Sequence, residues 1–245
     1  MIAIAEISGA DSIAAALRFA EQHPGARLVP TYASTGTEYG DFSQIEANVA
    51  FLREQLPARG AVLEGELARI TDPSLWRALC GRHARAMVER FGSYLPCVGC
   101  HLYLHLMRVP IAQDRGATCV VSGEREHHGT RTKANQTSAA LDTYVAVLAE
   151  AGIELALPIR EVTDSADIEA ILGPRWTGGS PQLECVLKGN ETGPDGSCVH
   201  ALPQGFAEEF LLPAGRAVAR QMLEGDNAWD TAVDPLVRPA AADAV

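Results

Sequence analysis

The sequence has few aromatic residues, few positive charges and no long apolar run. Aromatic residues make up 6% of its 245 positions, so the core is expected to consist of Ala, Val, Leu and Ile. Lys and Arg number 20 against 31 Asp and Glu, which gives a net charge of −11. This balance argues against a broad nucleic-acid footprint, because affinity for nucleic acid rests mainly on cationic contacts. A nucleic-acid partner is therefore disfavoured.

Segments that would direct the chain to a membrane are also lacking. No apolar run is long enough to span a bilayer, and residues 1–7 lack the basic region and cleavage site of a signal peptide. We therefore expect a cytoplasmic protein without a membrane partner. Its six cysteines are then expected to bind metal, to act in catalysis or to be buried, rather than to form disulfides.

Strand-like and helix-like segments alternate in the first part of the chain. Residues 2–7 resemble a strand buried on both faces of a sheet, and two further strands are expected at 27–34 and 61–64. Residues 13–22 form an amphipathic helical pattern, and Ser43 with Glu46 indicates a capping box that opens a helix over 43–56. Two successive crossovers predict an α/β fold, a doubly wound parallel sheet with helices on both faces.

The remaining segments extend this pattern into one domain over residues 1–225. Residues 226–245 are expected to be a disordered tail. The sequence leaves open whether the protein is a homodimer. The further expected elements are helices at 74–91, 100–115, 138–151, 166–172 and 204–224, and strands at 117–122 and 153–157.

The turn Ser8-Gly9-Ala10-Asp11-Ser12 lies between the first predicted strand and helix. The unpaired N–H groups of a helix N-terminus carry positive partial charge and favour phosphate. Gly9 permits close backbone approach, Ser8 and Ser12 offer hydroxyl donors, and Asp11 could cap the helix or hold Mg²⁺. An ordinary N-capped turn would show the same residue types.

The same residues carry a resemblance to a known family. The turn resembles the Ser-Gly-Gly-x-Asp-Ser loop of the PP-loop ATP pyrophosphatases, with Ile7 in the place of the leading Ser. The segment Thr35-Gly36-Thr37-Glu38 is similar to the adenine-side segment of related members, which implicates Thr35 and Gly36. The resemblance covers roughly residues 1–175 and implies a Rossmann-like fold. It also implies ATP binding and cleavage of ATP between the α and β phosphates, which adenylates a substrate oxygen.

A Cys-x-x-Cys pair, Cys97 and Cys100, precedes a predicted helix. Two thiolates at this spacing can share a metal ion or cluster, and a helix N-terminus lowers their pKa. Further ligand candidates are Cys185, Cys198, Cys80 and His101. Four thiolates would form a structural Zn²⁺ site, and three would hold an iron–sulfur cluster with one free iron. A redox pair and simple burial remain open.

A charged stretch, from Gly123 to Lys133, follows the predicted strand 117–122. Its position at the ligand edge of the sheet favours binding, although charged runs are usually solvated loops. Arg125 and Lys133 could stabilise charge on phosphate, Glu124 could bind Mg²⁺, and His127 could exchange protons near neutral pH.

The cysteines extend the resemblance to the cluster-dependent sulfur-transfer branch of the PP-loop enzymes. That branch implies a [4Fe–4S] cluster on Cys97, Cys100 and Cys185, with a sulfur donor as partner. The resemblance implies an adenylating sulfurtransferase. The acidic composition favours a small molecule or nucleobase over tRNA as substrate. Alternatives are a desulfurase, a zinc-containing ligase similar to the deazapurine nitrile synthase, and a non-catalytic nucleotide sensor.

Overall fold

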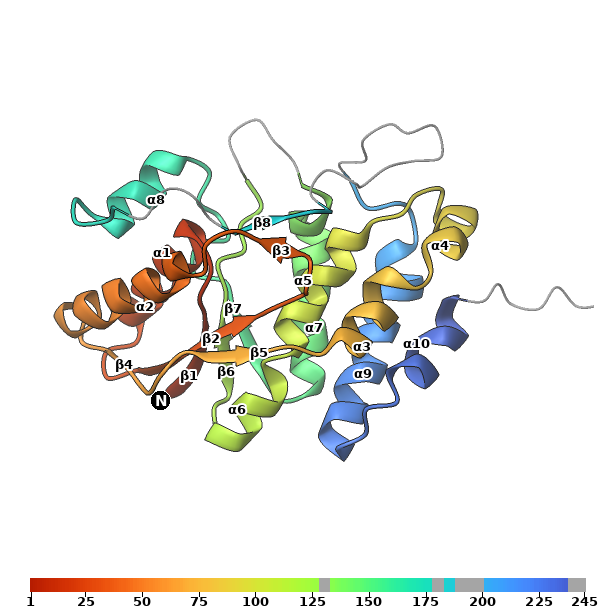
Figure 1. The fold of residues 1–245 in the computed structure, drawn as a ribbon, viewed down its shortest axis with the longest axis horizontal. Helices are drawn as coiled ribbons and strands as arrows, with labels where there is room; N and C mark the ends of the chain where they lie inside the picture. The colour runs from red at the N-terminus through yellow and green to blue at the C-terminus, as the bar shows by residue number, and fades with distance from the viewer. Residues whose placement is uncertain (128–132, 178–182, 188–200, 238–245) are drawn as a thin grey trace, which may run out of the picture.

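A parallel sheet with the strand order β4-β2-β1-β6-β7 forms the centre of the fold (Figure 1). The computed structural model describes residues 1–127, 133–177, 183–187 and 201–237. The predicted doubly wound α/β fold is confirmed, because the order changes direction at β1, which pairs with β2 on one side and β6 on the other. The strands are β1 (Ile2–Glu6), β2 (Arg27–Ala33), β4 (Val62–Leu63), β6 (Cys119–Val121) and β7 (Glu154–Ala156).

The outer edge of β2 is shared by two short strands. Arg27 and Leu28 pair with β4, and residues 31–33 pair with β5 (Ala68–Ile70). Pro30 lies between the two pairings. Because proline has no N–H group to donate to a ladder, the edge is interrupted at this point.

Helices cover both faces of the sheet. Along β1, Ala3 and Ala5 belong to one core and Ile4 to the other, as expected for side chains that alternate between faces. The first core packs against α1 (Ala10–Gln22), α2 (Ser43–Gln55) and α8 (Ser165–Leu172). The second core is covered by α3 (Pro73–Trp76), α4 (Ala84–Phe91), α5 (Pro96–Leu106), α6 (Val109–Arg115), α7 (Ser138–Glu150) and α9 (Leu212–Glu224).

Three predicted helices are interrupted. The helix expected over 100–115 divides into α5 and α6, because the ring of Pro110 would clash with the carbonyl of Leu106. The helix expected over 74–91 is broken by a π-helical turn at Arg77–Gly81, and the one over 204–224 begins with a π-helical turn at Ala207–Leu211. Helix-favouring composition does not distinguish these turns from regular α-helix.

Two further expectations are corrected. Ser43 does not cap α2: its own N–H donates to the carboxylate of Asp41 at 2.9 Å, and Phe42 occupies the cap position. The expected disordered tail is wrong for residues 229–237, which form α10 (Trp229–Val237). Trp229 is buried there because it packs in the second core and donates its indole N–H to Asp72 at 2.8 Å.

A two-stranded antiparallel ribbon stands apart from the main sheet. It pairs β3 (Glu38–Tyr39) with β8 (Glu184–Cys185), in the register Glu38 opposite Cys185. In Figure 1 the ribbon crosses the upper edge of the molecule, near the start of α5. Short 3₁₀ turns occur at Pro57–Arg59 and Ala134–Gln136. In the described part of the chain, no helix is long and apolar enough to cross a membrane.

Candidate functional site

A cavity of about 1040 Å³ opens at the carboxyl ends of β1 and β6, where a doubly wound sheet usually binds its ligands. We call it the phosphate-turn cavity. The turn before α1 forms one wall, the residues after β6 form another, and α8 with Trp176 closes the outer side. The residues that line it and carry the argument are Glu6, Ser8, Gly9, Ala10, Asp11, Ser12, His101, Gly123, Glu124, Arg125, Lys133, Gln136 and Trp176.

The turn presents an uncapped helix N-terminus to this cavity. Gly9 is the N-cap residue of α1 and has no side chain with which to cap the helix. The hydroxyl of Ser12 accepts from the Ser8 N–H at 2.8 Å and donates to the Gly9 carbonyl at 2.8 Å, which closes the turn. Asn48 holds it from α2 by donating to the Ser8 carbonyl at 2.6 Å. The first amides of α1 are therefore available to an anion.

The segment after β6 packs directly on this turn. A Cβ at Gly123 would lie 2.4 Å from the backbone N of Ser12, so only glycine fits. Two residues later the side chain of Arg125 enters the cavity, 7% exposed, with its Nε 3.3 Å from Oδ2 of Asp11. A guanidinium and the positive end of α1 thus face the same space, where negative charge is favoured.

A buried charged cluster forms the floor of the cavity. Glu124 accepts from Nδ1 of His101 at 2.5 Å and from Nε2 of Gln136 at 2.6 Å, and Nε2 of His105 lies 3.3 Å from it. Burial alone would lower the pKa of His101, but the charge and hydrogen bond of Glu124 raise it to about 9. Burial would raise the pKa of Glu124, but the two histidines hold it well below its usual range. Both groups are therefore charged near neutral pH.

A second, smaller cavity of about 180 Å³ adjoins the turn on the side of α2. We call it the aromatic cavity. Trp176 and Glu6 line both cavities, so the two spaces meet at the turn. Its other notable lining residues are Tyr32, Glu38, Ile45, Asn48, Arg108 and Leu183. Arg108 is fully buried and donates from Nε to Thr31 at 2.9 Å. The apolar surface with a few polar groups suits a flat ring.

The cysteine pair begins α5, directly before the cavity residue His101. The thiol of Cys80, on the π-helical turn at residues 77–81, forms a hydrogen bond with Cys100 that lowers the pKa of Cys100. Burial raises the pKa of Cys80 well above its ordinary value, and this hydrogen bond raises it further, so Cys80 is the donor. Gly99 lets α5 approach this turn closely, because a Cβ there would lie 2.5 Å from the carbonyl oxygen of Leu79.

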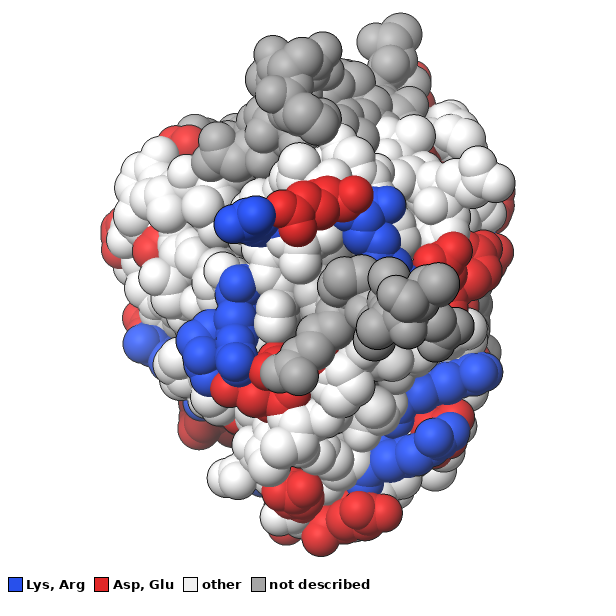
Figure 2. Space-filling model, turned by 90° about the vertical axis from the view of Figure 1, so that its right-hand side faces the viewer, with Lys and Arg blue, Asp and Glu red and all other residues white. Residues whose placement is uncertain are grey.

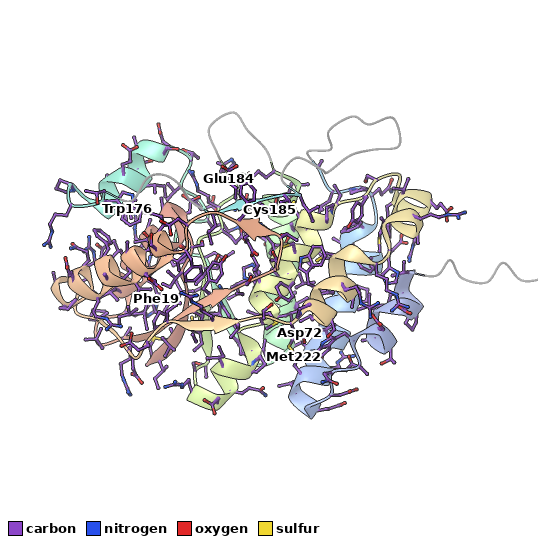
Figure 3. The ribbon with its side chains drawn as sticks, viewed as in Figure 1. Phe19, Asp72, Trp176, Glu184, Cys185 and Met222 are labelled. Atoms are coloured by element: carbon purple, nitrogen blue, oxygen red, sulfur yellow. The ribbon has the colours of Figure 1, made fainter. Side chains whose placement is uncertain are left out.

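Cys185 is held separately, on the ribbon. Its Sγ lies 3.2 Å from the hydroxyl of Thr37 and accepts from the Leu187 N–H at 3.4 Å. Figure 3 shows Cys185 on β8 and Trp176 below α8, both at the upper edge of the molecule, to which the ends of β1 and β6 also point. In the described ranges, no three or more Cys, His, Asp or Glu side chains are grouped so that they could hold a metal ion.

Most residues predicted to bind the nucleotide or to act in catalysis line the phosphate-turn cavity, but His127, Thr35 and Gly36 do not, and the predicted ligands Cys97, Cys100 and Cys185 also lie outside it. The turn at residues 8–12, together with Gly123, Glu124, Arg125 and Lys133, lines it. His127 is exposed and lines neither cavity. Thr35 and Gly36 also lie outside both cavities, and the loop contributes Glu38 instead, which accepts from the Thr35 N–H at 2.8 Å. Cys198 lies outside the described residues.

The roles of two acidic residues also change. Both oxygens of Glu124 accept hydrogen bonds from His101 and Gln136, so we do not expect it to bind Mg²⁺. Glu126, two residues further along the same stretch, pairs with Arg160 at 2.5 Å and is likewise not expected to bind Mg²⁺. Asp11, with a side chain 33% exposed, is the remaining carboxylate of the turn that could hold a cation.

The sequence patterns missed several cavity residues. His101 was considered only as a metal ligand beside the cysteine pair, and its partner Glu124 lies 23 positions away. Trp176 and Arg108 had no motif that marked them. Glu6 ends β1, and its position directly before the turn was the one signal in the sequence. In the structure it accepts a hydrogen bond from Ser122 at 2.5 Å.

Comparison with known proteins adds one relative. A scan against models of protein families finds no match. The chain is 33% identical over 242 residues to the protein described as "Uncharacterized protein MJ0009" from Methanocaldococcus jannaschii. The match covers 96% of this chain and 86% of the archaeal protein. The similarity therefore extends over nearly the whole of this chain.

Proposed function

This chain belongs to the family of the archaeal protein MJ0009, and we propose that it is an ATP-dependent sulfurtransferase of the PP-loop type. In this proposal it adenylates a substrate oxygen, releases pyrophosphate and replaces the oxygen with sulfur. The single observation that carries the proposal is that the N-terminus of α1 and the buried guanidinium of Arg125 beside it line the same cavity.

The proposed adenylation follows from the charges around the cavity. A substrate oxygen attacks the α-phosphorus of ATP, the bond to the bridging oxygen breaks, and pyrophosphate leaves with that electron pair. The first amides of α1, Arg125 and Lys133 are placed to stabilise the charge that develops on the leaving group. Preorganised donors of this kind act most strongly where water is excluded.

Sulfur transfer completes the proposed reaction. Hydrosulfide attacks the activated carbon, and AMP leaves with the former substrate oxygen. Cys100 supports this step because its pKa is lowered by the hydrogen bond from Cys80 and because the adjacent residue, His101, lines the cavity. Soft thiolate chemistry and the nucleotide site would therefore be neighbours.

The fit of a [4Fe–4S] cluster to these residues is incomplete. A cluster on Cys97, Cys100 and Cys185 would supply hydrosulfide at its free iron. Cys97 and Cys100 share the first turn of α5, but Cys185 contacts Thr37 and the described residues contain no converged set of three ligands. The cluster, and Zn²⁺ as its alternative, stay predictions, and the adenylation does not depend on either.

The proposed substrate is a small molecule or a nucleobase. Net charge is −11, and on the face shown in Figure 2 acidic and basic side chains alternate without a continuous basic field. The aromatic cavity, at about 180 Å³, has room for one ring of modest size. A nucleobase carbonyl would supply the oxygen that the proposed reaction activates.

The decisive test is a paired assay on anaerobically purified protein. Pyrophosphate release from ATP is measured with and without candidate nucleobases, together with iron and acid-labile sulfide. We expect release that depends on a substrate, and loss of iron in Cys97→Ala, Cys100→Ala and Cys185→Ala, with Cys119→Ala as the control because Cys119 is buried in the sheet. ATP binding without pyrophosphate release would favour the sensor, and zinc in place of iron would favour the ligase.

A further inference from the structure

Arg125 is a buried guanidinium with unsatisfied N–H groups. Its residue is 5% exposed, and within the described part of the chain neither Nε nor Nη1 has a hydrogen-bond acceptor. Nε is 3.3 Å from Oδ2 of Asp11, close enough for charge attraction, but the pair is not aligned as a hydrogen bond. A buried charged donor without an acceptor is unfavourable. The Nε and Nη1 groups of Arg125 are therefore available to an acceptor on a bound ligand.

Asp11 puts a negative charge where a polyphosphate would bind. It belongs to the first turn of α1, whose positive end favours its carboxylate. A polyphosphate bound at the turn would meet this negative charge at close range. Arg125 compensates Asp11 in the free protein, but one guanidinium cannot fully pair with a carboxylate and a polyphosphate together. A second cation is needed when the polyphosphate binds.

Asp11 is suited to hold that second cation. Mg²⁺ is usually bound by one or two carboxylates together with phosphate oxygens and water, rather than by a cage of protein ligands. The described residues accordingly need no cluster of three acidic ligands, and they contain none. The carboxylate of Asp11 lines the cavity and is 33% exposed, so a hydrated cation can reach it.

We infer that Arg125 exchanges partners when a polyphosphate binds. It pairs with Asp11 in the free protein and with phosphate oxygens of pyrophosphate, or of a nucleotide, in the complex. Asp11 then binds the divalent cation that accompanies the polyphosphate. No covalent bond changes in this exchange. The inference rests on the proposed function only for the class of ligand, and it makes Arg125 the residue that couples polyphosphate binding to the divalent cation.

The exchange predicts opposite effects for its two members. In Asp11→Asn the negative charge is gone and Arg125 is free, so pyrophosphate binds without Mg²⁺ at least as tightly as in the natural protein. The gain in affinity from Mg²⁺ is then lost. In Arg125→Gln the compensating charge is gone, so pyrophosphate affinity falls tenfold or more both with and without Mg²⁺. A structural role for the pair predicts equal losses in both variants.

The experiment is calorimetric titration of the full chain with sodium pyrophosphate, in EDTA and in excess Mg²⁺. The natural protein is expected to bind at least tenfold more tightly with Mg²⁺. Arg59→Gln is the matched control, because Arg59 pairs with Glu21 at the other end of α1, at 3.1 Å. It should bind pyrophosphate as the natural protein does. Circular dichroism and thermal unfolding of each variant establish that it is folded.

Each outcome decides a different point. If Asp11→Asn keeps the full Mg²⁺ effect, or if Arg125→Gln binds within twofold of the natural protein, the exchange is refuted while the proposed enzyme stands. If the natural protein binds no pyrophosphate even with Mg²⁺, the phosphate site itself is refuted. If the exchange is observed but no pyrophosphate is released from ATP with any substrate, the binding inference stands and the sulfurtransferase proposal fails.

Discussion

Replacing Gly123 by alanine tests whether the segment after β6 sets the position of the phosphate turn. The added Cβ would lie 2.4 Å from the N of Ser12 and 2.6 Å from the carbonyl carbon of Asp11. Ordinary contacts between heavy atoms are about 3.5 Å or longer, so the two segments must separate by about 1 Å. All the nearest atoms belong to backbone, so no side chain can rotate to relieve the contact.

We expect two measurable consequences. Overpacking of this kind lowers the free energy of unfolding by about 1–3 kcal/mol, which urea denaturation can measure. Displacement of a binding group by about 1 Å can reduce a rate on the order of 100-fold, so ATP-dependent pyrophosphate release should fall at least tenfold. Pyrophosphate affinity should fall with it, because the amides of α1 move away from Arg125.

Gly116→Ala provides the matched control for Gly123→Ala. Gly116 ends α6 with φ of +61°, and no atom lies within 4 Å of its added Cβ. Alanine there is strained by about 1–2 kcal/mol through its left-handed backbone alone, so stability falls while pyrophosphate binding is unchanged. If Gly123→Ala binds pyrophosphate as Gly116→Ala does, the close packing on the turn does not position the site and the reasoning is refuted.

Three further predictions concern the buried cluster, the cysteines and the C-terminal helix. The pKa of His101 is about 9 in the folded protein against about 6.5 in the unfolded chain. Protonated His101 therefore stabilises the fold by up to about 3 kcal/mol below pH 6.5, and this stabilisation is lost as the pH rises to 9. In urea unfolding, the free energy of unfolding of His101→Gln should fall less over that pH range than that of the natural protein. Cys80→Ala removes a hydrogen bond to Cys100 and should raise the pKa of Cys100. Alkylation of Cys100 by iodoacetamide should then require a higher pH, and an unchanged pH profile of alkylation would contradict the contact. Removal of residues 226–245 should destabilise the protein by several kcal/mol, because Trp229, Val233 and Val237 are buried; thermal unfolding that does not change would restore the expectation of a disordered tail.

The sequence predicted the central sheet because its signal is local. Apolar runs such as residues 2–7 and 117–122 are typical of strands buried on both faces, and each was followed by a helix pattern. The interruptions were not predictable in the same way. Arg77–Gly81 begins with the helix-favouring residues Arg77, Ala78 and Leu79, and its π-helical turn packs Gly81 against the ring of Trp76. Such a contact depends on the final packing.

The candidate site was predictable only where it belongs to one turn of chain. The residue types of segment 8–12, and its place between a strand and a helix, predicted a phosphate-binding turn. His101 could not be found this way, because its role depends on Glu124 from the end of another strand. The opposite error occurred at His127, which is in a charged stretch but is exposed. Residues from different segments become a site only through the strand order.

The charges at the carboxyl edge of the sheet explain how an acidic protein can offer a site for a polyanion. Four carboxylates line the phosphate-turn cavity: Glu6, Asp11, Glu124 and, exposed on α8, Glu169. Glu124 is paired with His101 of α5, Asp11 is paired with Arg125, and Glu6 accepts hydrogen bonds from the hydroxyls of Ser8 and Ser122. Because local pairing rather than net charge sets the potential inside a buried cavity, the positive end of α1 is not cancelled there. Of the carboxylates that line the cavity, Asp11 lies in the first turn of α1, where the inferred polyphosphate binds. The expected exchange therefore displaces the pair between Asp11 and Arg125, and the expected cation dependence follows from that carboxylate.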